Sequence, residues 1–257
     1  MLVAAAVCPC PPLLVPEVAT GAAPELDAAR AACVDAVGLL AAARPERLYV
    51  VGPVGAGAHG AYPGGTTGSF AGFGVDLSVR LGEGPSGSGA DRSADTAPLA
   101  EGDGALPGER GTLPPSLAVG AWLLTRTHWA GAPVEGLGVD VAATPDHCAG
   151  AGRELAASAE RVALLVLGDG SACRTVKAPG YLDERAAGFD AEAARALAAA
   201  DTAALLALDA GLASALKAAG RAPWQVLAGA AEGAGLDGRL LFEDAPYGVG
   251  YFVAAWS

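Results

Sequence analysis

The first part of the chain alternates between short apolar runs and a helical pattern. The runs 2–7 and 48–54 end near proline or glycine, as buried strands do. Between them, over 24–43, apolar residues recur every three or four positions on one helix face: Leu26, Ala29, Cys33, Val37 and Leu40. This order predicts a strand–helix–strand unit with parallel strands and a right-handed crossover.

The same alternation returns in the second half of the chain. A helix is predicted over 115–129, and another near 145–160 separates apolar runs at 134–141 and 162–167. The second run is unbroken and closes on Gly168, which indicates a central strand buried on both faces.

The last third is alanine-rich and predicts helices, with Asp201 and Asp209 as N-caps. Two apolar runs follow and turn at 246–248, which is typical of a closing β-hairpin. The ranges expected to be helical are 190–199, 201–219 with a break near Asp209, and 223–232.

Two stretches lack a regular pattern. Residues 55–74 are expected to form a glycine-rich loop, followed by a short strand at 75–79. Residues 82–112 contain almost no large apolar side chain, so we expect a flexible Gly/Ser/acidic surface loop; a lid is the alternative. The whole chain, 1–257, is therefore predicted to be one α/β domain with a mostly parallel or mixed central sheet flanked by helices.

Charge excludes two classes of partner. The net charge is −12, and Lys177 and Lys217 are the only lysines, so no basic stripe is available for nucleic acid or an anionic membrane. No apolar run approaches the roughly 20 residues that span a bilayer. A small molecule or a protein is the expected partner.

The cysteines indicate a reducing compartment. There are five of them, scattered along the chain, and the apolar start has no basic leader of the kind that directs export. We therefore expect free thiols in the cytoplasm. Their spacing, with Cys8 and Cys10 one residue apart and no second close pair, matches no zinc motif.

One glycine motif can be set aside. Gly55, Gly57 and Gly60 have the G-x-G-x-x-G spacing of dinucleotide-binding turns, but Pro63 and further glycines follow where a helix must begin. A flexible loop is the better interpretation.

The candidate site residues follow predicted strands. Cys10 lies at the exit of the first strand and His59 in the loop after the second, whereas Asp169 and Ser171 lie in the turn GDGS after the central strand. Asp169 either orients a ligand or caps its turn, and Lys177 is either its partner or an ordinary surface residue. Ser171 does not fit G-x-S-x-G, so a serine hydrolase is not supported.

Three segments carry a family resemblance: VCPCPPLLVPEV (7–18), YVVGPVGAG (49–57) and LVLGDGSACR (165–174). Together they resemble the class III extradiol dioxygenase superfamily, whose relatives include the Memo-like proteins. The segments APGYLD (178–183), WQVLAGAA (224–231) and PYGVGYF (246–252) look like an alanine-rich actinobacterial branch of it.

This resemblance implies an Fe(II) site formed by two histidines and a glutamate, with a further histidine as acid and base. This chain departs from that pattern at each histidine. Cys10, Val54–Gly55 and Ala172 stand where the family has them, and Glu232 or Glu17 are the candidates for the glutamate. Ordinary ring cleavage is therefore not expected.

Three hypotheses follow. In the first, the chain is a pseudoenzyme, a metal-free descendant of that family that works without a cofactor. It binds a small molecule or a protein in a strand-end cleft lined by Cys10, His59, Asp169 and Ser171. In the second, the chain is an active enzyme. It is then either an oxidoreductase, dioxygenase-like, with Fe(II) or Zn on Cys10, His59 and Glu232, or a hydrolase or transferase that uses Asp169, Ser171 and Lys177. In the third, the apolar end 246–256 forms a homo-oligomer surface.

Overall fold

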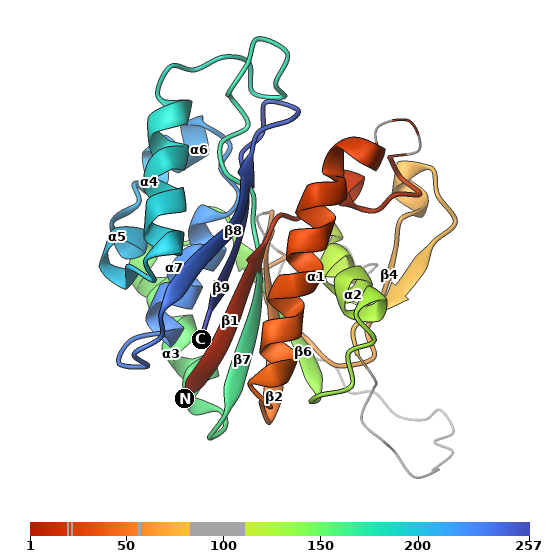
Figure 1. The fold of residues 1–257 in the computed structure, drawn as a ribbon, viewed down its shortest axis with the longest axis vertical. Helices are drawn as coiled ribbons and strands as arrows, with labels where there is room; N and C mark the ends of the chain where they lie inside the picture. Colours follow the sequence, from red (N-terminus) through yellow and green to blue (C-terminus); the bar gives the residue numbers. More distant parts are fainter. Residues whose placement is uncertain (20, 22, 56–57, 83–110) are drawn as a thin grey trace, which may run out of the picture.

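A seven-stranded mixed sheet forms the centre of the molecule, with helices on both faces (Figure 1). The computed structural model describes residues 1–19, 21, 23–55, 58–82 and 111–257. The strand order is β3-β6-β2-β7-β1-β9-β8. The predicted α/β architecture with a mixed sheet is confirmed.

Four neighbouring strands are parallel, and they form the middle of the sheet: β6 (Val134–Asp140), β2 (Arg47–Val54), β7 (Val162–Leu167) and β1 (Leu2–Cys8). The remaining three strands run antiparallel to their neighbours: β3 (Gly60–Tyr62), β9 (Tyr251–Trp256) and β8 (Gly238–Asp244). The predicted closing hairpin is the β8–β9 pair.

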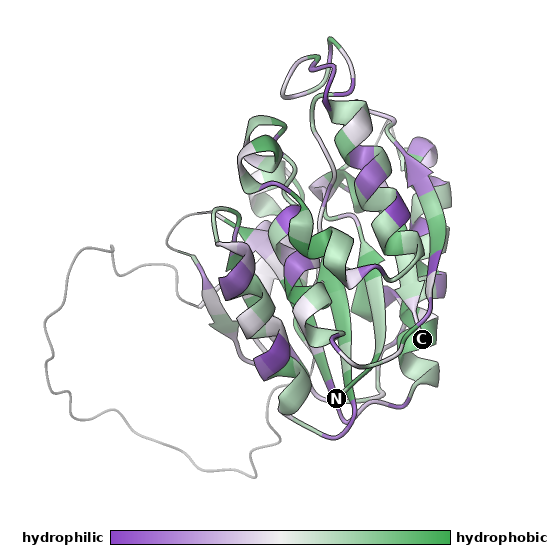
Figure 2. Cartoon of the chain, turned by 90° about the vertical axis from the view of Figure 1, so that its left-hand side faces the viewer, coloured by the Kyte–Doolittle hydropathy of each residue, from purple (hydrophilic) through white to green (hydrophobic). Residues whose placement is uncertain are grey.

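Helices cover the sheet unequally (Figure 1). One face is covered by α1 (Asp27–Ala42) and α2 (Pro115–Arg126). The other face carries five helices: α3 (Pro145–Ala157), α4 (Ala186–Ala198), α5 (Thr202–Ala207), α6 (Ala210–Ala215) and α7 (Arg221–Ala230). Figure 2 shows apolar residues concentrated in the strands and polar residues on the outer helix surfaces.

Local signals place several boundaries where they were expected. The carboxylates of Asp201 and Asp209 accept the N–H groups of Ala204 and Leu212, and so they cap α5 and α6. All six residues of β7 are buried, as predicted for a central strand. In the described ranges, no helix is both long and apolar enough to cross a membrane.

The structure of residues 58–80 differs from the prediction of a loop followed by one short strand. The expected loop 55–74 contains β3, the short strand β4 (Thr67–Ser69) and a 3-10 turn, η3 (Ala71–Phe73). The strand expected at 75–79 is β5 (Ser78–Arg80), which pairs with β4 in a small separate sheet. These strands have three residues each, too few for an alternating pattern to reveal them. Most of the loop predicted at 82–112 lies outside the described residues.

The helices α3 and α7 contact each other through their backbones. A Cβ atom added to Gly152 would lie 2.0 Å from the carbonyl oxygen of Val226, and one added to Gly229 would lie 2.2 Å from that of Ala149. Glycine at these two positions therefore permits a close crossing that no larger residue allows.

This contact gives a stability prediction with a control in the same helix. Gly152→Ala should lower the free energy of unfolding by about 1–3 kcal/mol, because its methyl group overlaps backbone atoms that cannot move independently. Gly150→Ala, where the nearest neighbouring atom is 4.0 Å away, should instead raise it by about 0.5–1 kcal/mol through helix propensity. Urea denaturation would measure both. Equal effects of the two substitutions would contradict the backbone contact.

Candidate functional site

The topology of the sheet predicts a ligand crevice at its carboxyl edge, between β1 and β7. The chain leaving β1 passes through the turn η1 (Pro12–Leu14) to α1 on one face, whereas the chain leaving β7 leads to α4 on the other. Neighbouring parallel strands whose connections go to opposite faces leave an open crevice beyond their ends, and open α/β sheets place ligands there.

Cys10 and Asp169 meet at this edge of the sheet. The backbone N–H of Cys10 donates to Oδ1 of Asp169 at 2.9 Å, and the Cys10 thiol lies 3.8 Å from Oδ2. The Cys10 side chain is buried, and Asp169 is half-buried. The two residues are 159 positions apart in the chain, and the pairing of β1 with β7 brings them together.

Burial sets the protonation of this pair. It raises the pKa of Asp169 to about 6, although the hydrogen bonds from Cys10 act in the opposite direction. Burial, and then the neighbouring Asp169 carboxyl, raise the pKa of the Cys10 thiol well above its ordinary value. Cys10 is therefore a neutral thiol near pH 7, and Asp169 exchanges its proton near pH 6.

Tyr251, at the start of β9, belongs to the same cluster and was missed by the sequence interpretation. Burial raises the pKa of its phenol, and the charges of Asp169, Cys10 and Tyr247 raise it further. Its side chain is buried, and none of the hydrogen bonds between described residues uses its hydroxyl. The only sequence signal was its place at the strand start, because β9 runs antiparallel and begins at the carboxyl edge.

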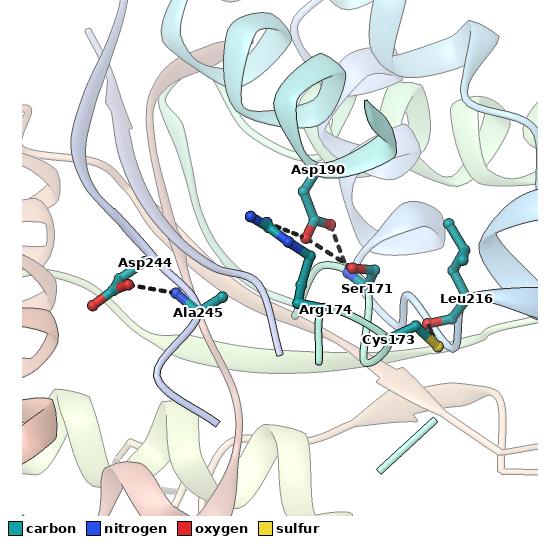
Figure 3. Close-up of polar contacts among 7 residues, drawn as sticks. All are labelled: Ser171, Cys173, Arg174, Asp190, Leu216, Asp244 and Ala245. Atoms are coloured by element: carbon teal, nitrogen blue, oxygen red, sulfur yellow. Dashed lines mark hydrogen bonds and ion pairs between the residues drawn. The ribbon is translucent and has the colours of Figure 1, made fainter. Parts of the chain in front are cut away.

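Ser171 serves a different purpose. Its N–H and its hydroxyl donate to the two carboxylate oxygens of Asp190, at 2.7 and 2.8 Å, and Arg174 adds an ion pair at 3.0 Å (Figure 3). Both Ser171 and Asp190 are completely buried. This network attaches the loop after β7 to α4, so the geometry gives Ser171 a structural role.

The other predicted site residues lie apart from the crevice. The exposed ring of His59 is 5.3 Å from that of His147, and three strands separate β3, which follows His59, from β1. Lys177 is exposed, and the ion pairs of the described region do not include it. Glu232 follows α7 and pairs with Arg153 at 3.0 Å.

These positions bear on metal binding. In the described part of the chain, no three side chains of His, Cys, Asp or Glu converge as a metal site requires. The set Cys10, His59 and Glu232 is therefore not assembled. Strand β3, not a helix, begins at Gly60, so the G-x-G-x-x-G spacing also lacks the helix that a dinucleotide needs.

No protein-family model and no curated protein matches the sequence. Among solved structures, the chain is similar to the uncharacterized protein JW3007 from Escherichia coli K12. The match has a TM-score of 0.57 and 15% sequence identity, and it covers 99% of each chain. A likeness at this identity is one of fold alone.

The Ser171–Asp190 bond gives one prediction. Ser171→Ala should lower the free energy of unfolding by about 1.5–3 kcal/mol, because it removes a buried hydrogen bond to a charged group. Ser78→Ala, at an exposed position of β5, is the control and should change it by less than about 0.5 kcal/mol. Thermal or urea unfolding would compare them. Wild-type stability in Ser171→Ala would refute the structural role.

Asp169 gives a prediction about pH. Its carboxyl binds a proton more tightly in the folded state, with a pKa of about 6, than in the unfolded state, near 3.8. Ionisation of Asp169 therefore reduces stability as the pH rises through this window. Asp169→Asn lacks the titration. We expect its free energy of unfolding, relative to wild type, to increase from about pH 4 to about pH 6 and then to level off. Urea denaturation at a series of pH values would test this, and parallel curves for the two proteins would contradict it.

Proposed function

We propose that this protein is a metal-independent relative of the class III extradiol dioxygenases that binds a small molecule in the crevice between β1 and β7. The observation that carries the proposal is the half-buried Asp169 carboxyl, held by Cys10 at the point where the two chain connections diverge. Burial raises the pKa of this carboxyl to about 6, so its ionised form lowers the stability of the folded protein. Carboxyl groups with pKa values shifted in this way are concentrated at functional sites.

The free hydrogen-bonding groups define the kind of ligand. One oxygen of Asp169 accepts the Cys10 N–H, whereas the other has only the distant thiol, so it is available to a donor. Tyr251 adds a hydroxyl that no other described residue uses. We therefore propose a compact polar ligand that donates from hydroxyl or amine groups to Asp169.

The proposal includes no metal cofactor. The resembled family holds iron with histidines, and this chain has Cys10, Val54–Gly55 and Ala172 in their places. A neutral, buried thiol is a poor metal ligand because it must first lose its proton.

All five cysteines are unpaired, which supports the further proposal that the protein works in the reducing cytoplasm.

Catechol is a suitable first probe, because it carries two adjacent hydroxyl donors on a small ring. Its Kd would be measured by ligand-observed NMR titration for wild type and for Asp169→Ala. We expect the substitution to weaken binding about tenfold or more, the effect of losing a hydrogen bond to a charged group. In veratrole both hydroxyls are methylated, so it cannot donate to Asp169. Its affinity for wild type and for Asp169→Ala should therefore be no higher than the affinity of catechol for Asp169→Ala.

The control variant is Asp76→Ala, an exposed carboxylate before β5, which should bind catechol as wild type does. Equal affinity of wild type and Asp169→Ala would overturn the proposed site.

Elemental analysis of the purified protein tests the proposal that the protein works without a metal. Stoichiometric iron or zinc that is lost in Cys10→Ala would show that the protein is a metalloprotein.

A further inference from the structure

A cavity opens on the face of the sheet that is covered by five helices. It has a volume of about 490 Å³, within the roughly 300–1,000 Å³ of small-molecule sites. Its wall is formed by the residues after β6, by α6, and by the segment that enters α7: Val141, Ala142, Ala210, Gly211, Ala213, Ser214, Lys217, Ala218, Ala219 and Arg221.

The lining is mostly apolar, and both of its charged residues are cationic. Alanine and valine form most of the wall, and the charged lining residues are Lys217 and Arg221. Lys217 is exposed, and its ammonium group donates to the carbonyl of Pro179 at 3.3 Å. The side chain of Arg221 is 2% exposed. The cavity therefore combines a largely apolar wall with two positively charged side chains.

The buried guanidinium of Arg221 has no direct counter-ion among the residues that the structure describes. Its guanidinium donates to the carbonyls of Ala143 and Val141 and to the side-chain oxygen of Gln225. Its Nε has no protein partner, and the ion pairs found among described residues do not include it.

Two carboxylates influence Arg221 from a distance. Asp140 and Asp209 act on it electrostatically, but neither forms an ion pair with it in the described structure. A buried cation that is satisfied mainly by carbonyl dipoles is costly unless an anion joins it. The arrangement therefore favours a ligand that brings a negative charge.

We infer that this cavity binds a small organic carboxylate, whose apolar body packs against the alanines of α6 and whose carboxylate lies between Lys217 and Arg221. The lining does not include Cys10 or Asp169. Backbone hydrogen bonds connect the two regions: the N–H of Gly220 donates to the carbonyl of Asp169 and the N–H of Ala172 to that of Leu216, each at 2.8 Å.

Octanoate is the test ligand, and isothermal titration calorimetry gives its Kd. Octanol, which lacks the charge, and acetate, which lacks the apolar body, should each bind at least about tenfold more weakly than octanoate. Lys217→Gln should weaken octanoate binding about five- to tenfold, the effect of one partly exposed charge. Ala210→Leu, which fills the cavity, should weaken it at least as much.

The control is Arg239→Gln, which removes one positive charge from an exposed position on β8 and should leave the Kd of octanoate unchanged. Asp169→Ala should also leave it unchanged, and this separates the inference from the proposed function. No measurable octanoate binding by wild type would overturn the inference. Equal binding of octanoate and octanol would do the same, as would wild-type affinity in both Lys217→Gln and Ala210→Leu.

Discussion

The fold depends on one constraint, which is the burial of β7 on both faces. All six of its residues are apolar and inaccessible, and the strand is paired with β1 on one side and β2 on the other. Both faces of the sheet must therefore be covered by helices. The connection after β1 leads to one face and the connection after β7 to the other, and Cys10 and Asp169 lie where the two diverge.

Two carboxylates near this edge of the sheet, Asp190 and Asp169, differ in how far the chain uses their hydrogen-bonding capacity. Asp190 is completely buried and receives three donors from the chain, so its hydrogen-bonding capacity is largely used. Asp169 is less enclosed and receives one close donor. The first carboxylate holds a loop against a helix, whereas the second has lone pairs that the hydrogen bonds of the described residues do not use.

The sequence predicted the main strands and helices because each carries a local signal. The apolar run of β7, the helical spacing in α1 and the capping aspartates of α5 and α6 each act within a few residues. The short strands β3, β4 and β5 carry no such signal, because a three-residue strand is too short to show periodicity.

The site was predictable only in part. Cys10 and Asp169 follow strands, so a rule about strand ends could place them at the same edge. Ser171 lies in the same turn as Asp169 and was also expected to line the site. Its role instead depends on Asp190, which lies 19 residues away on a helix. Tyr251 joins Cys10 and Asp169 through the pairing of β9 with β1, and no spacing in the sequence connects it to them.

The arrangement of the outer strands has a consequence for the behaviour of the protein at high concentration. One hypothesis from the sequence made the apolar end 246–256 an oligomer surface. Its strand β9 is buried and pairs along its outer edge with β8, so the edge strands of the sheet are β8 and β3. Strand β3 is only three residues long, and β8 ends in the exposed acidic pair Glu243 and Asp244. Short or charged margins disfavour the lateral strand pairing from which fibrous aggregates grow. With a net charge of −12, copies of the chain also repel one another, which favours colloidal stability in dilute salt.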